Sequence, residues 1–290
     1  MRKITLALLV ASICLILGQY SQALAQSIKF GVLANKGAQE AFRKWKPMTD
    51  YMKAKSGQDI VLAPLNFKQL TEAFQKGEID IATSNPGMYI FFREKYGVYP
   101  IVTTSKKGIP YMGGVILVKK DSSINSLAQL RGKNISIVSF KSLGGYVLQA
   151  YLFKKNGIDL SKECKLKPYR NQDHVVFSVL NGVADAGFVR TNQLESMVKR
   201  GLANLDDYKI IHSQRHENFP YLASTDLVPA WPFFVMQRVD KGFVKKVESA
   251  LLSLTSSSPE AKAAGISGFI PPGDYEPVAE ALRSLGMEPF

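Results

Sequence analysis

The chain has 290 residues, and its 37 Lys and Arg outnumber its 24 Asp and Glu, so the formal net charge is +13. The basic residues are scattered, without a long run and without interleaved aromatic residues, which argues against a nucleic-acid-binding surface. A general positive field is compatible with a small anionic ligand. The length is sufficient for one large domain or for two lobes of ordinary size.

The first 25 residues have the pattern of a secretory signal peptide. Arg2 and Lys3 form a basic start, residues 4–18 are apolar, and Ala23 and Ala25 supply a small-x-small cleavage site. The alternative is an uncleaved membrane anchor, although the apolar run is short for a bilayer span. We expect removal of residues 1–25 and export to the periplasm. Since Arg2 and Lys3 leave with the signal, the mature net charge becomes +11.

Short β-branched runs alternate with amphipathic helical stretches, which predicts βαβ units and mainly parallel sheets. In the first part of the chain we expect strands at 28–33, 60–65 and 79–84, and helices at 37–56, 67–76 and 88–96. Pro47 is expected to kink the first helix or to end its first part. An apolar strand at 111–119 has turn residues on both sides, so it is suited to carry the chain between two lobes.

The same alternation continues after this strand. We expect strands at 135–139, 165–169, 185–189, 208–213 and 221–225, and helices at 145–156, 173–181, 192–200, 241–254, 259–264 and 276–285. The preferred architecture is α/β, with 26–108 plus 214–290 in one lobe and 109–213 in the other. Because ligands of open α/β sheets lie beyond the carboxyl ends of the strands, we expect one ligand cleft between the lobes.

A strand-to-helix junction at 139–145 has the chemistry of an anion site. Ser139 and Ser142 supply hydroxyls, and Gly144 and Gly145 begin a helix whose first N–H groups lack intrahelical partners. Lys141 would add a positive charge. The alternative is an ordinary Ser N-cap with glycines in a tight loop. The spacing is not that of a P-loop.

Two other junctions are candidates for the same cleft. Arg190 and Thr191 follow a predicted strand, and an arginine offers bidentate hydrogen bonds to oxyanions. The alternative for Arg190 is a salt bridge with a nearby acid such as Glu195. In the other lobe, Asn85 precedes a helix that carries Tyr89 one turn later. The alternative for Asn85 is that it only caps this helix.

The remaining reactive residues give weaker signals. His174 begins a predicted helix, where it either donates to an anion or faces solvent, and His212 and His216 form a close pair without acidic ligands. The single cysteine of the mature chain, Cys164, is expected to be a buried thiol. The chain has neither a Gly-x-Ser-x-Gly elbow nor a His-Glu-x-x-His motif. We therefore expect no metal, no cofactor and no catalysis.

Several segments together carry a family resemblance. They are residues 27–33, Trp45-Lys46-Pro47-Met48 with Tyr51, residues 77–82, residues 182–191, Ser224-Thr225 and Trp231-Pro232-Phe233. This set resembles the phosphate/phosphite/phosphonate-binding protein family, which are periplasmic solute-binding proteins of ABC transporters. The elements Phe-Val-Arg-Thr and Trp-Pro-Phe are most similar to a subgroup that includes periplasmic sensor domains of tetrathionate-sensor-like histidine kinases.

The resemblance implies a type II periplasmic binding protein fold, in which two α/β lobes on a two-strand hinge close over the ligand. The ligand contacts that it implies are Ser139, Ser142, Gly144, Gly145 and His174 in one lobe and Asn85, Pro86 and Tyr89 in the other.

Two departures from the family pattern bear on the ligand. Phe140, Lys141 and Leu143 interrupt the usual Ser/Thr cluster, and Arg190 stands where an acidic residue is often found. An arginine there favours a more fully anionic ligand. We therefore expect a monomeric protein that delivers a small oxyanion of phosphorus or sulfur to an ABC permease. The alternative is a sensory binding protein acting through a membrane kinase or receptor, and an exported enzyme is the least favoured function.

Overall fold

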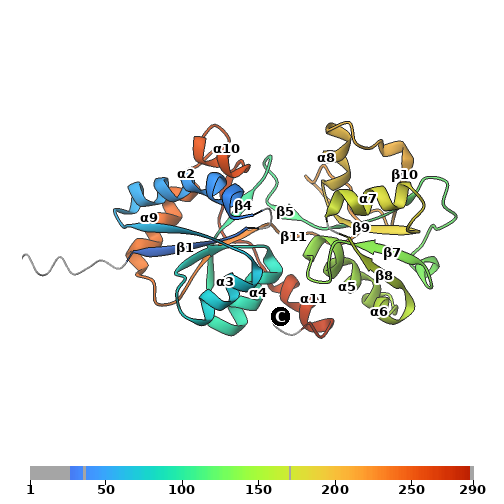
Figure 1. Ribbon diagram of the computed structural model, residues 1–290, viewed down its shortest axis with the longest axis horizontal. Coiled ribbons are helices and arrows are strands. Elements are labelled where there is room, and N and C mark those ends of the chain that lie inside the picture. Colours follow the sequence, from blue (N-terminus) through green and yellow to red (C-terminus); the bar gives the residue numbers. More distant parts are fainter. Residues whose placement is uncertain (1–26, 35–36, 170, 288–290) are drawn as a thin grey trace, which may run out of the picture.

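The computed structural model describes residues 27–34, 37–169 and 171–287, and the predicted signal peptide lies outside them. Two α/β lobes lie side by side with a narrow connection between them (Figure 1). In the described part of the chain, no helix is both long enough and apolar enough to cross a membrane.

The first lobe is built on a six-stranded sheet in the order β13-β4-β12-β3-β1-β2. Its strands are β1 (Ile28–Leu33), β2 (Ile60–Leu65), β3 (Ile81–Thr83), β4 (Tyr99–Ser105), β12 (Pro232–Val235) and β13 (Gly268–Ile270). Its helices are α2 (Ala38–Ser56), α3 (Phe67–Gln75), α4 (Pro86–Tyr96), α9 (Lys241–Leu252), α10 (Pro259–Ala264) and α11 (Glu276–Ser284). β1 is parallel to β2 and β3, whereas β12 is antiparallel to β3 and β4. The carboxyl ends of β1, β2 and β3 therefore meet at one edge of the sheet.

α2 continues through Pro47, so this proline does not end the helix. Trp45, Met48 and Met52 are buried on one side of α2. The Trp45 ring lies edge-on to the Phe233 ring, with centroids 5.6 Å apart. Proline has no backbone N–H group, so α2 lacks one helical hydrogen bond at Pro47. Packing of the apolar side against the sheet stabilises the helix in spite of this loss.

The second lobe is built on a five-stranded sheet in the order β10-β6-β9-β7-β8. Its strands are β6 (Gly114–Lys119), β7 (Asn134–Ile137), β8 (Lys165–Pro168), β9 (Ala186–Arg190) and β10 (Tyr208–Ile211). Its helices are α5 (Leu148–Lys155), α6 (Leu160–Glu163), α7 (Gln172–Leu180) and α8 (Gln193–Lys199), with short turns η1 (Ala128–Leu130), η2 (Leu143–Val147) and η3 (Leu205–Asp207). β7 is parallel to β8 and β9, so the chain leaves all three strands at the same edge.

Two short antiparallel strands, β5 (Tyr111–Met112) and β11 (Val228–Pro229), lie between the lobes (Figure 1). The strand predicted at 111–119 is therefore divided at Gly113, where the chain passes from β5 into β6. Thr191 is hydrogen-bonded to the backbone at this position. Its Oγ1 accepts a hydrogen bond from Gly113 N at 3.1 Å, and its N donates to Gly113 O at 3.0 Å.

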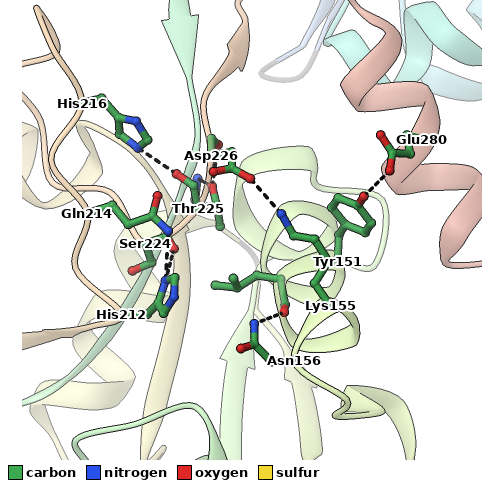
Figure 2. Close-up of polar contacts among 12 residues, drawn as sticks. Tyr151, Lys155, Asn156, His212, Gln214, His216, Ser224, Thr225, Asp226 and Glu280 are labelled. Carbon is green, nitrogen blue, oxygen red and sulfur yellow. Dashed lines mark hydrogen bonds and ion pairs between the residues drawn. The ribbon is translucent and has the colours of Figure 1, made fainter.

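Residues 214–225 are attached to the second sheet. Ser224 N donates to Gly114 O at 2.8 Å, and Gly114 N donates to Thr225 Oγ1 at 2.9 Å. His212 Nδ1 lies 2.9 Å from Ser224 O, and His216 Nε2 lies 3.1 Å from Thr225 O (Figure 2). The predicted lobe boundary at 213/214 comes before this segment. We propose that the lobes divide at β5 and β11 instead.

The C-terminal helix α11 contacts both lobes. It packs on α4 of the first lobe and on α5 of the second. The Tyr151 hydroxyl on α5 donates to Glu280 Oε1 on α11 at 2.6 Å (Figure 2), and Lys154 Nζ donates to Ser284 O. A single cluster of buried apolar residues accordingly includes residues of α4, α11 and α5.

Candidate functional site

The segment that follows β7 leads into the start of a helix. Ser142 is the N-cap of η2, a π-helical turn that continues directly into α5. Ser142 N donates to Ser139 O at 3.1 Å, and Val147 N donates to Ser142 O at 3.0 Å. Neither serine hydroxyl has a hydrogen-bond partner among the described residues. The amides between Ser142 and Val147 belong to the first turn, where N–H groups lack intrahelical partners. Single π-turns are frequent at functional sites.

Gly144 and Gly145 let this segment approach its neighbours closely. A Cβ at position 144 would lie 2.9 Å from Arg190 Cβ and 2.9 Å from Gly113 O. A Cβ at position 145 would lie 2.8 Å from Ser142 Oγ and 3.1 Å from Gln172 Nε2. The structure therefore brings the start of η2, the end of β9 and the start of α7 together.

Arg190, the last residue of β9, is half-buried. Its Nη1 donates to Thr191 O and its Nη2 donates to Gln193 Oε1, both at 3.1 Å. An arginine has five N–H donors, so three of them have no partner among the described residues. Burial lowers the pKa of Arg190, and the charges of Glu195 and Asp173 counteract part of this effect. Arg190 is thus a partly desolvated cation with hydrogen-bond donors that have no partner among the described residues.

The salt bridge considered for Arg190 is not formed. Glu195 Oε1 instead accepts a hydrogen bond from Leu222 N at 2.7 Å. Asn192, with φ at 60°, adopts the left-handed conformation that asparagine tolerates better than most residues. This turn begins α8 directly after β9, so that Gln193 faces Arg190.

Gln172 and Gln193 are two residues of this site that the sequence analysis missed. Gln172 Oε1 accepts a hydrogen bond from Arg190 N at 3.1 Å. Both glutamines are the first residues of helices that follow parallel strands. The rule that ligands lie beyond the carboxyl ends of such strands would have identified them.

Thr191 and His174 lie beside this group. The Thr191 side chain is 4% exposed, and its hydroxyl oxygen accepts the hydrogen bond from Gly113 N. His174 is exposed on the first turn of α7, where its backbone N donates to Asn171 Oδ1 at 3.0 Å. Ligand contacts from these two residues stay predictions.

The predicted residues of the first lobe serve its own packing. Asn85 Oδ1 accepts a hydrogen bond from Met88 N at 3.0 Å and caps α4, which is the alternative that its sequence context left open. Pro86 is buried at the start of that helix. Tyr89 is 2% exposed and packs against Phe234, and burial raises its pKa to about 12. A ligand contact from these residues stays a prediction.

Lys141 reaches from the second lobe to the first. Its Nζ lies 4.6 Å from the centroid of the Phe67 ring, at the start of α3. Phe140, the preceding residue, is 46% exposed and lies edge-on to Tyr146. The segment at 139–145 therefore faces the other lobe.

The remaining candidate residues are the cysteine thiol and the possible metal ligands. Cys164 is buried, and its Sγ donates to Leu130 O at 3.3 Å. Burial is the main cause that raises the pKa of this thiol. Among the described residues, no group of His, Cys, Asp and Glu is arranged to hold a metal ion.

Comparison with known proteins places this arrangement in a family. A family model described as "ABC transporter, phosphonate, periplasmic substrate-binding protein" matches residues 30–276. The chain belongs to this family. Its members are the periplasmic substrate-binding components of transporters, and the family predicted from the sequence is confirmed.

A curated relative of this chain is a sensor kinase. The tetrathionate sensor histidine kinase TtrS of Salmonella typhimurium is 25% identical over 251 residues, which cover 81% of this chain and 41% of the kinase. The chain thus spans less than half of the length of this relative.

Several solved structures have the same fold as this protein. The protein XAC2383 of Xanthomonas citri bound to ATP has a TM-score of 0.71 at 19% identity, with 90% of this chain and 98% of that chain covered. PhnD1 of Prochlorococcus marinus in complex with methylphosphonate has a TM-score of 0.65 at 15% identity, with 90% and 99% covered. The predicted type II periplasmic binding protein fold is confirmed.

Proposed function

We propose that this protein captures a small oxyanion of phosphorus between its lobes and delivers it to an ABC transporter from the periplasm. The ligand is of the phosphonate, phosphite or phosphate type. One observation carries the proposal. Arg190 is half-buried, has no carboxylate partner among the described residues, and lies beside Gly144 at the start of η2. A desolvated guanidinium is costly unless an anion accompanies it, and an oxyanion supplies that partner.

The remaining groups around Arg190 suit the same ligand. The hydroxyls of Ser139 and Ser142 and the first amides of η2 are hydrogen-bond donors for oxyanion oxygens, and the positive end of a helix dipole favours the anion there. Lys141 adds a positive charge at the face toward the first lobe. Neighbours that hold methylphosphonate or ATP are below 20% identical, so they support the fold, and Arg190 supports the chemistry.

Lobe closure is the mechanism that we propose for capture. The connection through β5 and β11 is short, so the lobes are able to rotate about it. A ligand that contacts both lobes binds the closed state more tightly and shifts the population toward it. A transporter permease would then recognise the closed state.

Sensing is a second candidate function, favoured by the similarity to TtrS over 81% of this chain. The same closed state would then bias a membrane kinase or receptor. The ligand separates the two functions. A phosphorus oxyanion supports uptake, whereas a response confined to sulfur oxyanions supports sensing.

A thermal-shift screen of residues 26–290 tests the proposal. The panel contains phosphate, phosphite, methylphosphonate, aminoethylphosphonate, sulfate, thiosulfate and tetrathionate, with amino acids and sugars as controls. A ligand at 100 times its dissociation constant adds about 2.7 kcal/mol to the free energy of unfolding, which is readily detected. No shift with any oxyanion would contradict the ligand assignment and leave the fold unaffected.

A further inference from the structure

A carboxylate lies near Arg190 without pairing with it. Asp173, on the first turn of α7, is bound by Arg200 through two hydrogen bonds of 2.9 Å, Nη1 to Oδ2 and Nη2 to Oδ1. The Gln193 amide lies between Asp173 and Arg190. Its Nε2 donates to Asp173 Oδ1 at 2.6 Å, and its Oε1 accepts from Arg190 Nη2 at 3.1 Å.

The chemistry of this chain of four residues determines the orientation of the amide. An ionised carboxylate only accepts hydrogen bonds, so Asp173 requires the NH₂ end of Gln193. The carbonyl end of Gln193 is thereby turned toward Arg190. The hydrogen bonds from Arg200 lower the pKa of Asp173, which keeps it ionised. The guanidinium of Arg190 is therefore held by a neutral acceptor.

Neither of the two nearby carboxylates forms a direct pair with Arg190. Arg200 balances the charge of Asp173 in a bidentate pair. This pair is partly exposed and lies at the end of the hydrogen-bonded series that is remote from Arg190. Glu195, the other nearby acid, accepts a hydrogen bond from Leu222 N through Oε1. Its Oε2 is buried without a hydrogen-bond partner among the described residues, so the charge of Glu195 acts on Arg190 without a direct bond. A direct Asp173–Arg190 pair would occupy the donors that an oxyanion needs.

We propose that Asp173, Gln193 and Arg200 are positioning residues that keep Arg190 without a direct carboxylate partner, so that its donors stay available to a fully ionised oxyanion. This inference rests on the proposed function and refines its ligand class. An ammonium group close to Arg190 would be repelled, so the site discriminates against ligands that place an amine beside the oxyanion. Methylphosphonate is then preferred to aminomethylphosphonate.

Affinity measurements on variants test the arrangement. The probe is methylphosphonate or, if another anion gives the largest shift in the screen, that anion, measured by calorimetry. Gln193→Glu places a carboxylate against Arg190 in the same space, and we expect the affinity to fall at least tenfold. Arg200→Gln leaves the charge of Asp173 unbalanced, and we expect a fall of three- to tenfold. Asp173→Asn combined with Arg200→Gln removes both charges and should recover most of that loss.

Two comparisons separate positioning from a general structural role. Arg200→Gln should have no further effect on affinity in an Arg190→Ala background, because its influence is exerted through Arg190. The matched control is Arg131→Gln, which breaks the pair between Arg131 and Glu163 in the same lobe and should leave the affinity unchanged. Thermal melts of the unliganded variants verify folding. The exposed Arg200→Gln variant keeps the test valid if Gln193→Glu does not fold.

The results distinguish this inference from the proposed function. If the wild-type protein binds no oxyanion, the proposed function fails. If the wild-type protein binds one and both Gln193→Glu and Arg200→Gln bind it within twofold of wild type, the positioning role is overturned and the proposed function stands.

Discussion

Arg190 is the residue on which the proposed ligand chemistry depends. The sequence places an arginine after a strand, where the family often has an acid, and the structure surrounds it with neutral acceptors. Burial of the guanidinium costs free energy in the unliganded protein, and under the proposed function a bound anion would offset this cost. Stability and affinity therefore respond differently when the side chain is removed.

We expect Arg190→Ala to weaken oxyanion binding more than tenfold while the melting temperature of the unliganded protein stays within a few degrees. Loss of a hydrogen bond to a charged group costs roughly 1.5–3 kcal/mol, which corresponds to a change of this size. Calorimetry and thermal melts measure the two quantities. Arg131→Ala, which removes an exposed arginine from the same lobe, is the control. Unchanged affinity would show that Arg190 is structural.

Gly144 makes a second residue-scale prediction, because a Cβ there would lie 2.9 Å from the backbone atom Gly113 O. We expect Gly144→Ala to lower the free energy of unfolding by about 1–3 kcal/mol, since the added methyl group must displace backbone. It should also weaken oxyanion binding by moving Arg190. Gly87→Ala, in the first turn of α4 with only an ordinary contact at 3.4 Å, is the matched control for denaturant unfolding. Equal stability of the two variants would contradict this account.

At the scale of elements, α5 of the second lobe packs on α11, which also packs on α4 of the first lobe. Tyr151 and Glu280 form the polar part of the contact between α5 and α11, and the hydrogen bond to Glu280 is the main cause that raises the pKa of Tyr151 to about 12. The folded protein therefore favours the protonated hydroxyl. The stability that this bond adds is present below the ordinary tyrosine pKa of about 10 and is lost as the pH rises toward 12.

Tyr151→Phe isolates this effect from that of the other tyrosines. We expect the variant to be less stable than wild type at pH 9, and the difference to shrink as the pH rises from 10 to 12, because only wild type loses a proton at this position. Urea unfolding across that range measures the difference. Glu280→Gln, which keeps an acceptor without the charge, should retain part of the stability. A difference that is constant with pH would exclude the Tyr151–Glu280 bond as its source.

At the scale of the whole molecule, two sheets with separate strand orders are joined by β5, β11 and the packing of α11. A short two-strand connection permits rotation, while α11 restricts it. We propose that ligand contacts decide how far the lobes close about this connection.

We expect the radius of gyration to fall when the oxyanion identified by the thermal-shift screen is added to ligand-stripped protein, because contacts from both lobes favour the closed state. Small-angle X-ray scattering with and without ligand measures it. Arg190→Ala at the same ligand concentration serves as the control and should show a smaller change. A ligand that binds by calorimetry without altering the scattering would argue against closure.

The sequence alone predicted the family, most of the alternation of strands and helices, and the strand-to-helix junctions near Ser142 and Arg190. These features follow from local periodicity and from the rule for parallel strands, which need no knowledge of distant residues. The sequence-based prediction missed β4, β12 and β13, and it placed a strand at 221–225 where the structure has none. The structure added what depends on contacts far apart in the chain. Pro47 lies inside a continuous α2 because the sheet supports that helix. Residues 214–225 lie with the second sheet because Ser224 bonds to β6.

Only the tertiary structure decided which partners Arg190 has. Glu195 is close in sequence but bonds to Leu222, whereas Asp173, from another helix, is bound by Arg200 and separated from Arg190 by Gln193. The strength of a charge pair depends on the separation of the two groups and on their burial, and neither can be read from the amino-acid sequence. The sequence predicted a cation at the edge of the sheet, and the fold determined that this cation remains without a carboxylate partner among the described residues.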